Sequence, residues 1–71
     1  MAMPEYQQRV IHEKNELNYK LLKLCKFFST DVFNSLPEDE KDRLHRQAKY
    51  MAEYIGVLAE RIFNFPQGNA E

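Results

Sequence analysis

The chain has 71 residues and a formal net charge of −1, from ten basic and eleven acidic side chains. This balance creates no field that would attract DNA, RNA or an anionic membrane, and no apolar run approaches the ~18 residues of a transmembrane helix. The single cysteine, Cys25, excludes an internal disulfide and, with two histidines, falls short of a four-ligand zinc site. We expect one domain in the cytosol, without a signal peptide. Self-association is also expected, because so short a chain is barely stable alone.

The first predicted helix runs from residue 4 to about residue 28. Pro4 suits its first turn, where a missing N–H costs nothing. One apolar face follows from the spacing of Tyr6, Val10, Leu17, Leu21, Leu24 and Phe28. Lys14 interrupts this face, and we interpret it as a lysine whose aliphatic stem lies at the edge of a packed seam. The apolar surface is widened by Ile11, Leu22 and Phe27, which indicates a helix with two neighbours.

The connection is predicted to contain one short helical turn, at residues 29–34. Its apolar side chains are expected to fill the open end of the hairpin, and they are Val32, Phe33 and Leu36. Ser35 and Glu38 have the spacing of a capping box, with Pro37 in the first turn of the next helix. These signals place the start of the second helix at about residue 36.

The second predicted helix runs from about residue 36 to residue 64, where Pro66 and Gly68 end it and leave a frayed tail at 66–71. Its apolar residues alternate steps of four and three, at Leu44, Ala48, Met51, Ile55, Leu58, Ile62 and Phe65. This spacing favours coiled-coil-like packing, and the short connection makes the two helices antiparallel. The expected fold is an all-α, antiparallel two-helix hairpin. Because two helices share one interface, we expect the remaining apolar surface to be covered by assembly into a helical oligomer.

The residue pattern does not predict catalysis, and we expect neither an enzyme nor a cofactor or metal ion. Cys25 is interpreted as a small apolar filler rather than a reactive thiol. His12 and His45 lie among charged neighbours on separate helices, without a carboxylate paired at helical spacing, and are expected on the solvated surface. The two glycines are isolated, which excludes a glycine-rich phosphate loop.

A binding pattern remains on the first helix, which is only basic beyond Glu16. Lys20, Lys23 and Lys26 lie on roughly one side, beside the apolar stripe, and Tyr6 and Arg9 lie near the other end of the helix. Two first helices packed antiparallel would bring Tyr6 and Arg9 of one chain to the lysines of the other. Rings beside cations can hold a flat base joined to a phosphate, although a lysine cluster is more often a plain solvated face.

Arg61, one turn before Phe65, forms a second candidate at the end of the second helix. If several copies of the chain formed a ring, Arg61 and Phe65 of each copy would lie near the symmetry axis of that ring. The plainer interpretation is a cation favoured by the helix dipole beside a packed phenylalanine, and the pattern alone does not choose between the two.

Three segments carry a family resemblance: YQQRVIHEKNELNYKLLKL, then F-x(4)-F-x(2)-LP, then MAEYIGVLAERIFNF. From about Tyr6 to Phe65 the chain resembles the phage hairpin domain of anti-CBASS cyclic-oligonucleotide sponges. A related hairpin occurs in sponges that counter other defences, with signals made from NAD, but those chains are longer, so the short length favours the anti-CBASS branch. The resemblance implies a hexamer in the cytoplasm of the infected bacterium. It also implies non-enzymatic sequestration of cyclic dinucleotides of the cyclic GMP–AMP type and of cyclic triadenylate, which keeps these signals from the defence effectors.

The resemblance also implies roles for individual residues. Tyr6 would stack on a base of the dinucleotide and Lys23 would bind phosphate. Lys20 or Lys26 would bind the phosphate instead if the chain aligned with the family in a different register. Arg61 would bind the phosphates of a trinucleotide on a three-fold axis, where Phe65 would pack on a base. Cys25 stands where a small hydroxyl residue is expected, and a thiol is a weaker donor. The alternative function is an oligomeric helical protein–protein interaction module without a nucleotide ligand.

Overall fold

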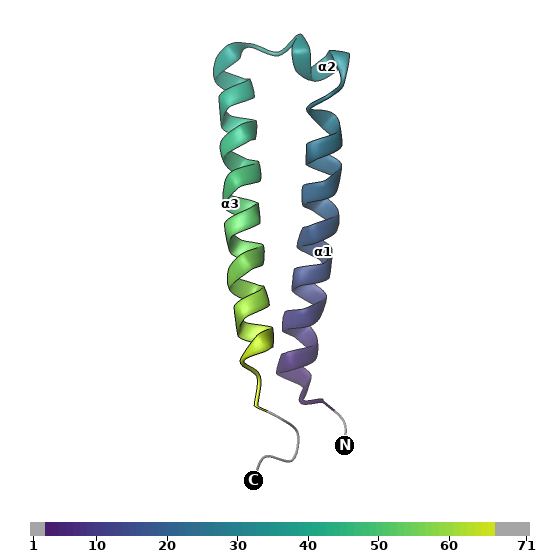
Figure 1. Ribbon diagram of the computed structural model, residues 1–71. Coiled ribbons are helices and arrows are strands. Elements are labelled where there is room, and N and C mark those ends of the chain that lie inside the picture. The colour runs from purple at the N-terminus through teal and green to yellow at the C-terminus, as the bar shows by residue number, and fades with distance from the viewer. Residues whose placement is uncertain (1–2, 67–71) are drawn as a thin grey trace.

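Two long antiparallel helices and one short helical turn make up the fold, which we describe from a computed structural model over residues 3–66 (Figure 1). Helix α1 covers Glu5–Phe27, α2 covers Asp31–Asn34 and α3 covers Glu38–Phe63. The all-helical hairpin with a short helical turn in its connection is therefore confirmed. Of the predicted tail at 66–71, residues 67–71, with Gly68, lie outside the described residues. Over residues 3–66, no helix is long and apolar enough to cross a membrane.

Each long helix begins directly after a proline, at Glu5 and Glu38, which is one and two positions later than expected. Pro4 and Pro37 are the N-terminal caps rather than members of the first turn. The carbonyl of Pro4 accepts the backbone N–H groups of Gln7 and Gln8 at 3.0 and 3.2 Å. The carbonyl of Pro37 accepts the N–H groups two and three residues after Glu38 in the same manner. The extended proline thus supplies the first carbonyl acceptor of each helix. Its lack of a backbone N–H costs nothing there, because an N–H at this position would have no partner within the helix.

The predicted capping box at Ser35 is wrong. Ser35 ends α2, and its hydroxyl donates to the Val32 carbonyl at 2.7 Å instead of capping α3. Thr30 is the cap that the prediction missed, because its Oγ1 accepts the N–H of Phe33 at 3.2 Å. The short helix α2 uses Ser35 for its own last turn, and α3 begins only after Pro37.

The core is a narrow seam between α1 and α3. Among the described residues, Val10, Phe33 and Leu58 are the buried apolar side chains. Every other member of the two predicted apolar stripes is half-buried except Tyr6, which is exposed. Lys14 is half-buried at the edge of the seam, in agreement with the interpretation of its stem as packing. The stripes therefore face one another as expected.

Aromatic rings close the end of the hairpin at α2. The Phe33 ring packs edge-on against Phe28, with ring centroids 5.0 Å apart, and the His45 ring lies 4.5 Å from that of Phe28. His45 remains exposed overall, but it contacts rings on two sides rather than only solvent. Val32 was expected to fill this end and does not, since it is 61% exposed. In a helix of four residues, only one side can face the hairpin, and Phe33 occupies it.

The shape leaves an unusual amount of surface uncovered. The molecule measures 56 × 15 × 14 Å and its radius of gyration is 16.6 Å, against about 11 Å for a compact domain of this length. The chain exposes 5564 Å², about 900 Å² more than a typical folded monomer of its mass. A rod made of two helices has too little interior to cover its apolar side chains.

Two neighbouring residues of α3 test the position of the seam. Leu58 is 0% exposed and Val57 is 52% exposed. We expect Leu58→Ala to lower the free energy of unfolding by about 3 kcal/mol, because it leaves a cavity in the seam. Val57→Ala should change it by no more than about 0.5 kcal/mol. Urea unfolding followed by circular dichroism at one fixed protein concentration measures both, and equal losses would contradict the described packing.

Candidate functional site

Tyr6 and Phe65, each predicted as a ligand-binding ring, lie together at the end of the hairpin where both termini lie (Figure 1). Their ring centroids are 5.9 Å apart and the planes meet at 74°, an edge-to-face contact. Tyr6 is 47% exposed, so one side of its ring stays available to a ligand. The buried Gln7 donates from Nε2 to the Tyr6 hydroxyl at 3.2 Å, which restrains the ring.

Two arginines accompany these rings. Arg9 is one turn from Tyr6 on α1 and pairs with Glu5, with Nη1 3.4 Å from Oε2. Arg61 lies in the last turn of α3 and is exposed. The antiparallel fold therefore places Tyr6, Arg9, Arg61 and Phe65 at one end, although the sequence suggested two separate sites for them.

The lysines of α1 lie far from that end. Lys23 is 17 positions after Tyr6, which is about 26 Å along an α-helix. Tyr19, which the sequence analysis passed over, is the ring beside the lysines: Lys23 Nζ lies 5.1 Å from its centroid. A single chain thus separates Tyr6 from the predicted phosphate lysines and gives those lysines a different aromatic neighbour.

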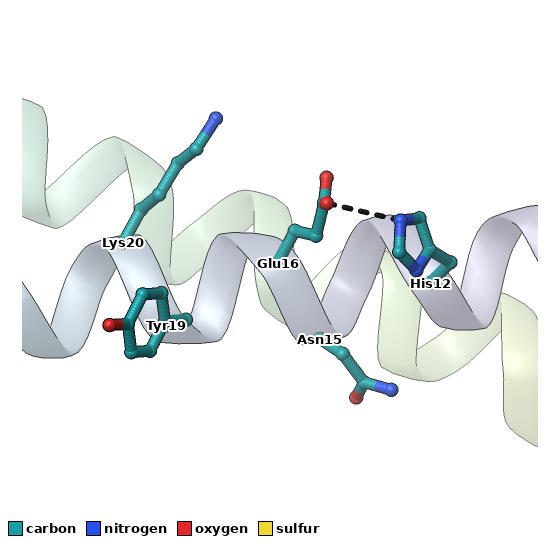
Figure 2. Close-up of a pocket in the computed structure, with 5 residues that line it drawn as sticks. All are labelled: His12, Asn15, Glu16, Tyr19 and Lys20. Atoms are coloured by element: carbon teal, nitrogen blue, oxygen red, sulfur yellow. Dashed lines mark ion pairs between the residues drawn. The ribbon is translucent and has the colours of Figure 1, made fainter.

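A shallow hollow lies on the side of α1 that is turned away from α3, as Figure 2 shows. It has a volume of about 410 Å³ and is lined by His12, Asn15, Glu16, Tyr19 and Lys20. His12 Nε2 lies 3.0 Å from Glu16 Oε2. The expectation that neither histidine has a carboxylate at helical spacing is therefore wrong for His12, because positions four apart are neighbours on a helix.

A second, smaller hollow crosses from α1 to α3. Its volume is about 210 Å³, and it is lined by Glu13, Glu16, Leu17, Lys20 and Tyr54. The Tyr54 hydroxyl donates to Glu13 Oε2 across the hairpin. Lys20 lines both hollows, whereas Lys23 and Lys26 line neither of them. Tyr54 was noted in the sequence only as a flank of α3, and its proximity to Lys20 depends on the register of the two helices.

The cations of the two long helices differ in whether a carboxylate is paired with them. In the first half of α3 the cations are paired with carboxylates three or four positions away: Lys41 with Glu38, Arg43 with Asp39 and Glu40, and Arg46 with Asp42. Arg43 Nε donates to Glu40 at 2.9 Å, and this hydrogen bond is the main reason that its pKa is raised. Within residues 3–66, by contrast, no carboxylate lies within 4.0 Å of a cationic nitrogen of Lys20, Lys23, Lys26 or Arg61.

Cys25 and the histidines add little chemistry. The Cys25 thiol is free and exposed, so its interpretation as a packed apolar filler is wrong. In the part of the chain that the structure describes, no three residues of the types His, Cys, Asp or Glu are grouped so that they could hold a metal ion.

Comparison with known families identifies the hairpin. The family model named Sequestin matches residues 4–64, which covers all three helices. The chain belongs to the Sequestin family. No curated protein and no solved structure matches the chain significantly. The Sequestin match includes both hollows and every predicted site residue except Phe65.

The site of this Sequestin member suits reversible binding. Exposed rings offer flat faces for stacking, and unpaired ammonium and guanidinium groups can donate to phosphate oxygens without first breaking an ion pair. The side-chain amide of Asn15 and the carboxylate of Glu16 can recognise the polar edge of a base.

The contact between Tyr6 and Phe65 can be measured by a double-mutant cycle. We expect Tyr6→Ala and Phe65→Ala to show a coupling energy of about 1 kcal/mol in unfolding experiments, because the rings touch edge to face. Tyr6→Ala and Tyr19→Ala provide the control, since about 13 positions of helix separate them and their effects should add within about 0.5 kcal/mol. A coupling of zero for the first pair would contradict the ring contact.

Proposed function

We propose that this Sequestin-family protein binds cyclic di- and trinucleotide signals and sequesters them without converting them, as a phage protein that counters CBASS defence. The observation that carries the proposal is a set of cations that have no carboxylate partner within residues 3–66 and that accompany aromatic rings. Lys23 lies against the exposed Tyr19 ring, Lys20 lines two hollows, and Arg61 is four positions before the half-buried Phe65. The family name supports sequestration, and the sequence resemblance supports the nucleotide class.

The chemistry of such ligands fits these side chains. Stacking on an aromatic ring contributes about 1–3 kcal/mol per base, and charge-assisted hydrogen bonds hold the phosphates. A long nucleic acid is a poorer ligand, because the net charge of −1 gives no attraction to an extended phosphate backbone. A small ligand with two or three phosphates needs only a local group of cations.

Assembly is part of the proposal. Tyr6 and Lys23 are about 26 Å apart along α1, too far for both to contact one cyclic dinucleotide within a single chain. Antiparallel pairing of two α1 helices about their middle would bring Tyr6 of one copy to the lysines of the other. We propose a hexamer in the host cytoplasm, with dinucleotides between paired chains and a trinucleotide near Arg61 and Phe65 on a three-fold axis.

The binding of a nucleotide can be tested by isothermal titration with a panel of cyclic di- and trinucleotides. We expect sub-micromolar binding of at least one of them, and native mass spectrometry should report both the number of chains and the number of ligands. Chromatography of the ligand released by denaturation should recover it unaltered, whereas a hydrolysed product would reveal an enzyme. The absence of binding across the panel at high protein concentration would overturn the proposal.

Lys49 on α3 provides a matched control for Lys23, because each lysine lies beside a tyrosine ring. Lys23 lies 5.1 Å from the Tyr19 ring, and Lys49 lies 5.8 Å from the Tyr50 ring on α3. We expect Lys23→Gln to weaken cyclic-dinucleotide binding at least tenfold, because a phosphate loses its charged donor. Lys49→Gln should leave the affinity within about twofold, since the site does not include it. The same titration measures both variants, and equal losses would mean that overall charge, rather than the proposed site, determines binding.

Tyr6 is tested separately, because its predicted partner lies on another chain. Tyr6→Ala should weaken dinucleotide binding by about tenfold or more through the loss of stacking, while native mass spectrometry shows an unchanged number of chains. Normal binding by this variant would remove Tyr6 from the site.

The ligand panel also distinguishes the remaining alternatives. If the protein bound NAD-derived cyclic nucleotides and not cyclic di- or trinucleotides, it would still be a sequestering protein, but for a different signal. A protein partner without nucleotide binding would favour the interaction module.

A further inference from the structure

A second, largely apolar surface runs along the hairpin and overlaps the hollow of Figure 2 only at Asn15. It centres on a hollow of about 430 Å³ between α1 and α3, lined by Ile11, Lys14, Asn15, Ala59, Ile62 and Phe63. We call it the Phe63 face. Phe63 projects from it and is 86% exposed, the most exposed of the large apolar side chains in residues 3–66.

The surroundings of this hollow form a strip rather than an isolated patch. One side of α3 carries a row of residues at spacings of four, three and four: Ala52, Gly56, Ala59 and Phe63. On α1, Ile11 and Leu22 are just over three full turns apart and also share one side. Each row extends about 16 Å along its helix. Leu22 is 52% exposed, so the strip continues beyond the hollow.

Small side chains beside one large ring create a shape that another helix can fit. A Cβ placed on Gly56 would meet no atom of this chain within 4 Å, so the fold of the single hairpin does not require a glycine there. A glycine in the middle of a helix is unfavourable relative to alanine. Close approach of a second backbone accounts for that choice, with the projecting Phe63 of the neighbour covering the row of small residues.

We infer that the Phe63 face is the surface on which a second copy of this chain docks. The area argument favours this occupant: the chain as a whole exposes about 900 Å² more than a typical monomer of its mass, and one partner buries about 800 Å² in a standard interface. A two-fold interface presents the same patch from both copies, and this strip contains both the projecting ring and the small residues that would receive it. Lys14 is the one charged residue lining the hollow, so pairing two copies brings few charges out of water.

This docking leaves the proposed ligand residues free. The hollow of Figure 2 lies on the side of α1 that is turned away from α3, and it shares only Asn15 with the Phe63 face. The inference concerns the ligand-free protein, so its failure is distinguishable from a failure of nucleotide binding.

Sedimentation velocity of the ligand-free protein over about 1 to 100 µM tests the inference. Wild type should sediment as an assembly, and Phe63→Lys should weaken association at least tenfold. The substitution suits the single chain, because a cation near the C-terminus of a helix is favourable and Phe63 is exposed. Val57→Lys is the matched control: it also replaces an exposed apolar residue of α3, but six positions from Phe63 and on another side of the helix. It should leave association within about twofold of wild type.

Gly56→Gln is the second variant. A Cβ at this position meets no atom of its own chain within 4 Å, and glutamine is a better helix former than glycine. Weaker association of this variant, with helix content retained by circular dichroism, therefore supports close contact between chains. A wild-type protein that sediments as one chain over the whole range would overturn the inference. So would association unchanged by both Phe63→Lys and Gly56→Gln, or a loss in Val57→Lys as large as that in Phe63→Lys.

Discussion

The seam between α1 and α3 determines the rest of this molecule, because apart from the rings around Phe33 it is where residues 3–66 remove apolar side chains from water. Leu58 is fully covered there, while most other stripe residues are only half-buried. A helix in a larger domain would pack on two or three neighbours, but here each long helix has one. Rings such as Tyr19 and Phe63 consequently remain on the outside, and cations next to them keep contact with solvent. The exposed rings and cations on which the proposed binding depends are a direct result of this thin core.

The spacing of apolar residues was sufficient to predict the seam. Steps of three and four bring Val10, Leu17 and Leu21 to one side of α1, and this geometry does not depend on any distant residue. The helix ends followed from proline within one or two positions. The connection was less predictable, since Ser35 can serve either the end of one helix or the start of the next. Which of these it serves depends on whether α2 forms, and that in turn depends on the burial of Phe33 against the long helices.

The candidate site was predictable in its residue types and less so in its groupings. Tyr6 and Phe65 are 59 positions apart, and only the antiparallel return of the chain brings their rings into contact. The bond between Tyr54 and Glu13 has the same origin, since a shift of α3 by one residue would turn Tyr54 away from α1. The pair of His12 and Glu16 is different, because its spacing of four was visible in the sequence and indicates a contact without any tertiary information.

The two long helices differ in how far their cations are neutralised by nearby carboxylates. At the start of α3, carboxylates three and four positions from each cation neutralise it locally, and their negative charge also favours the helix dipole there. On α1 after Glu16, Lys23 and Lys26 have no acidic residue at such a spacing, and Glu16, four positions before Lys20, pairs with His12 instead. The mutual repulsion of these lysines is a cost to the isolated helix. A neighbouring anion would remove that repulsion. The proposed docking strip and the proposed anion-binding surface must share one narrow rod. They can do so only on different sides of the same helix. The placement of Leu22 and Lys23 on adjacent positions of α1, about 100° apart, meets this requirement.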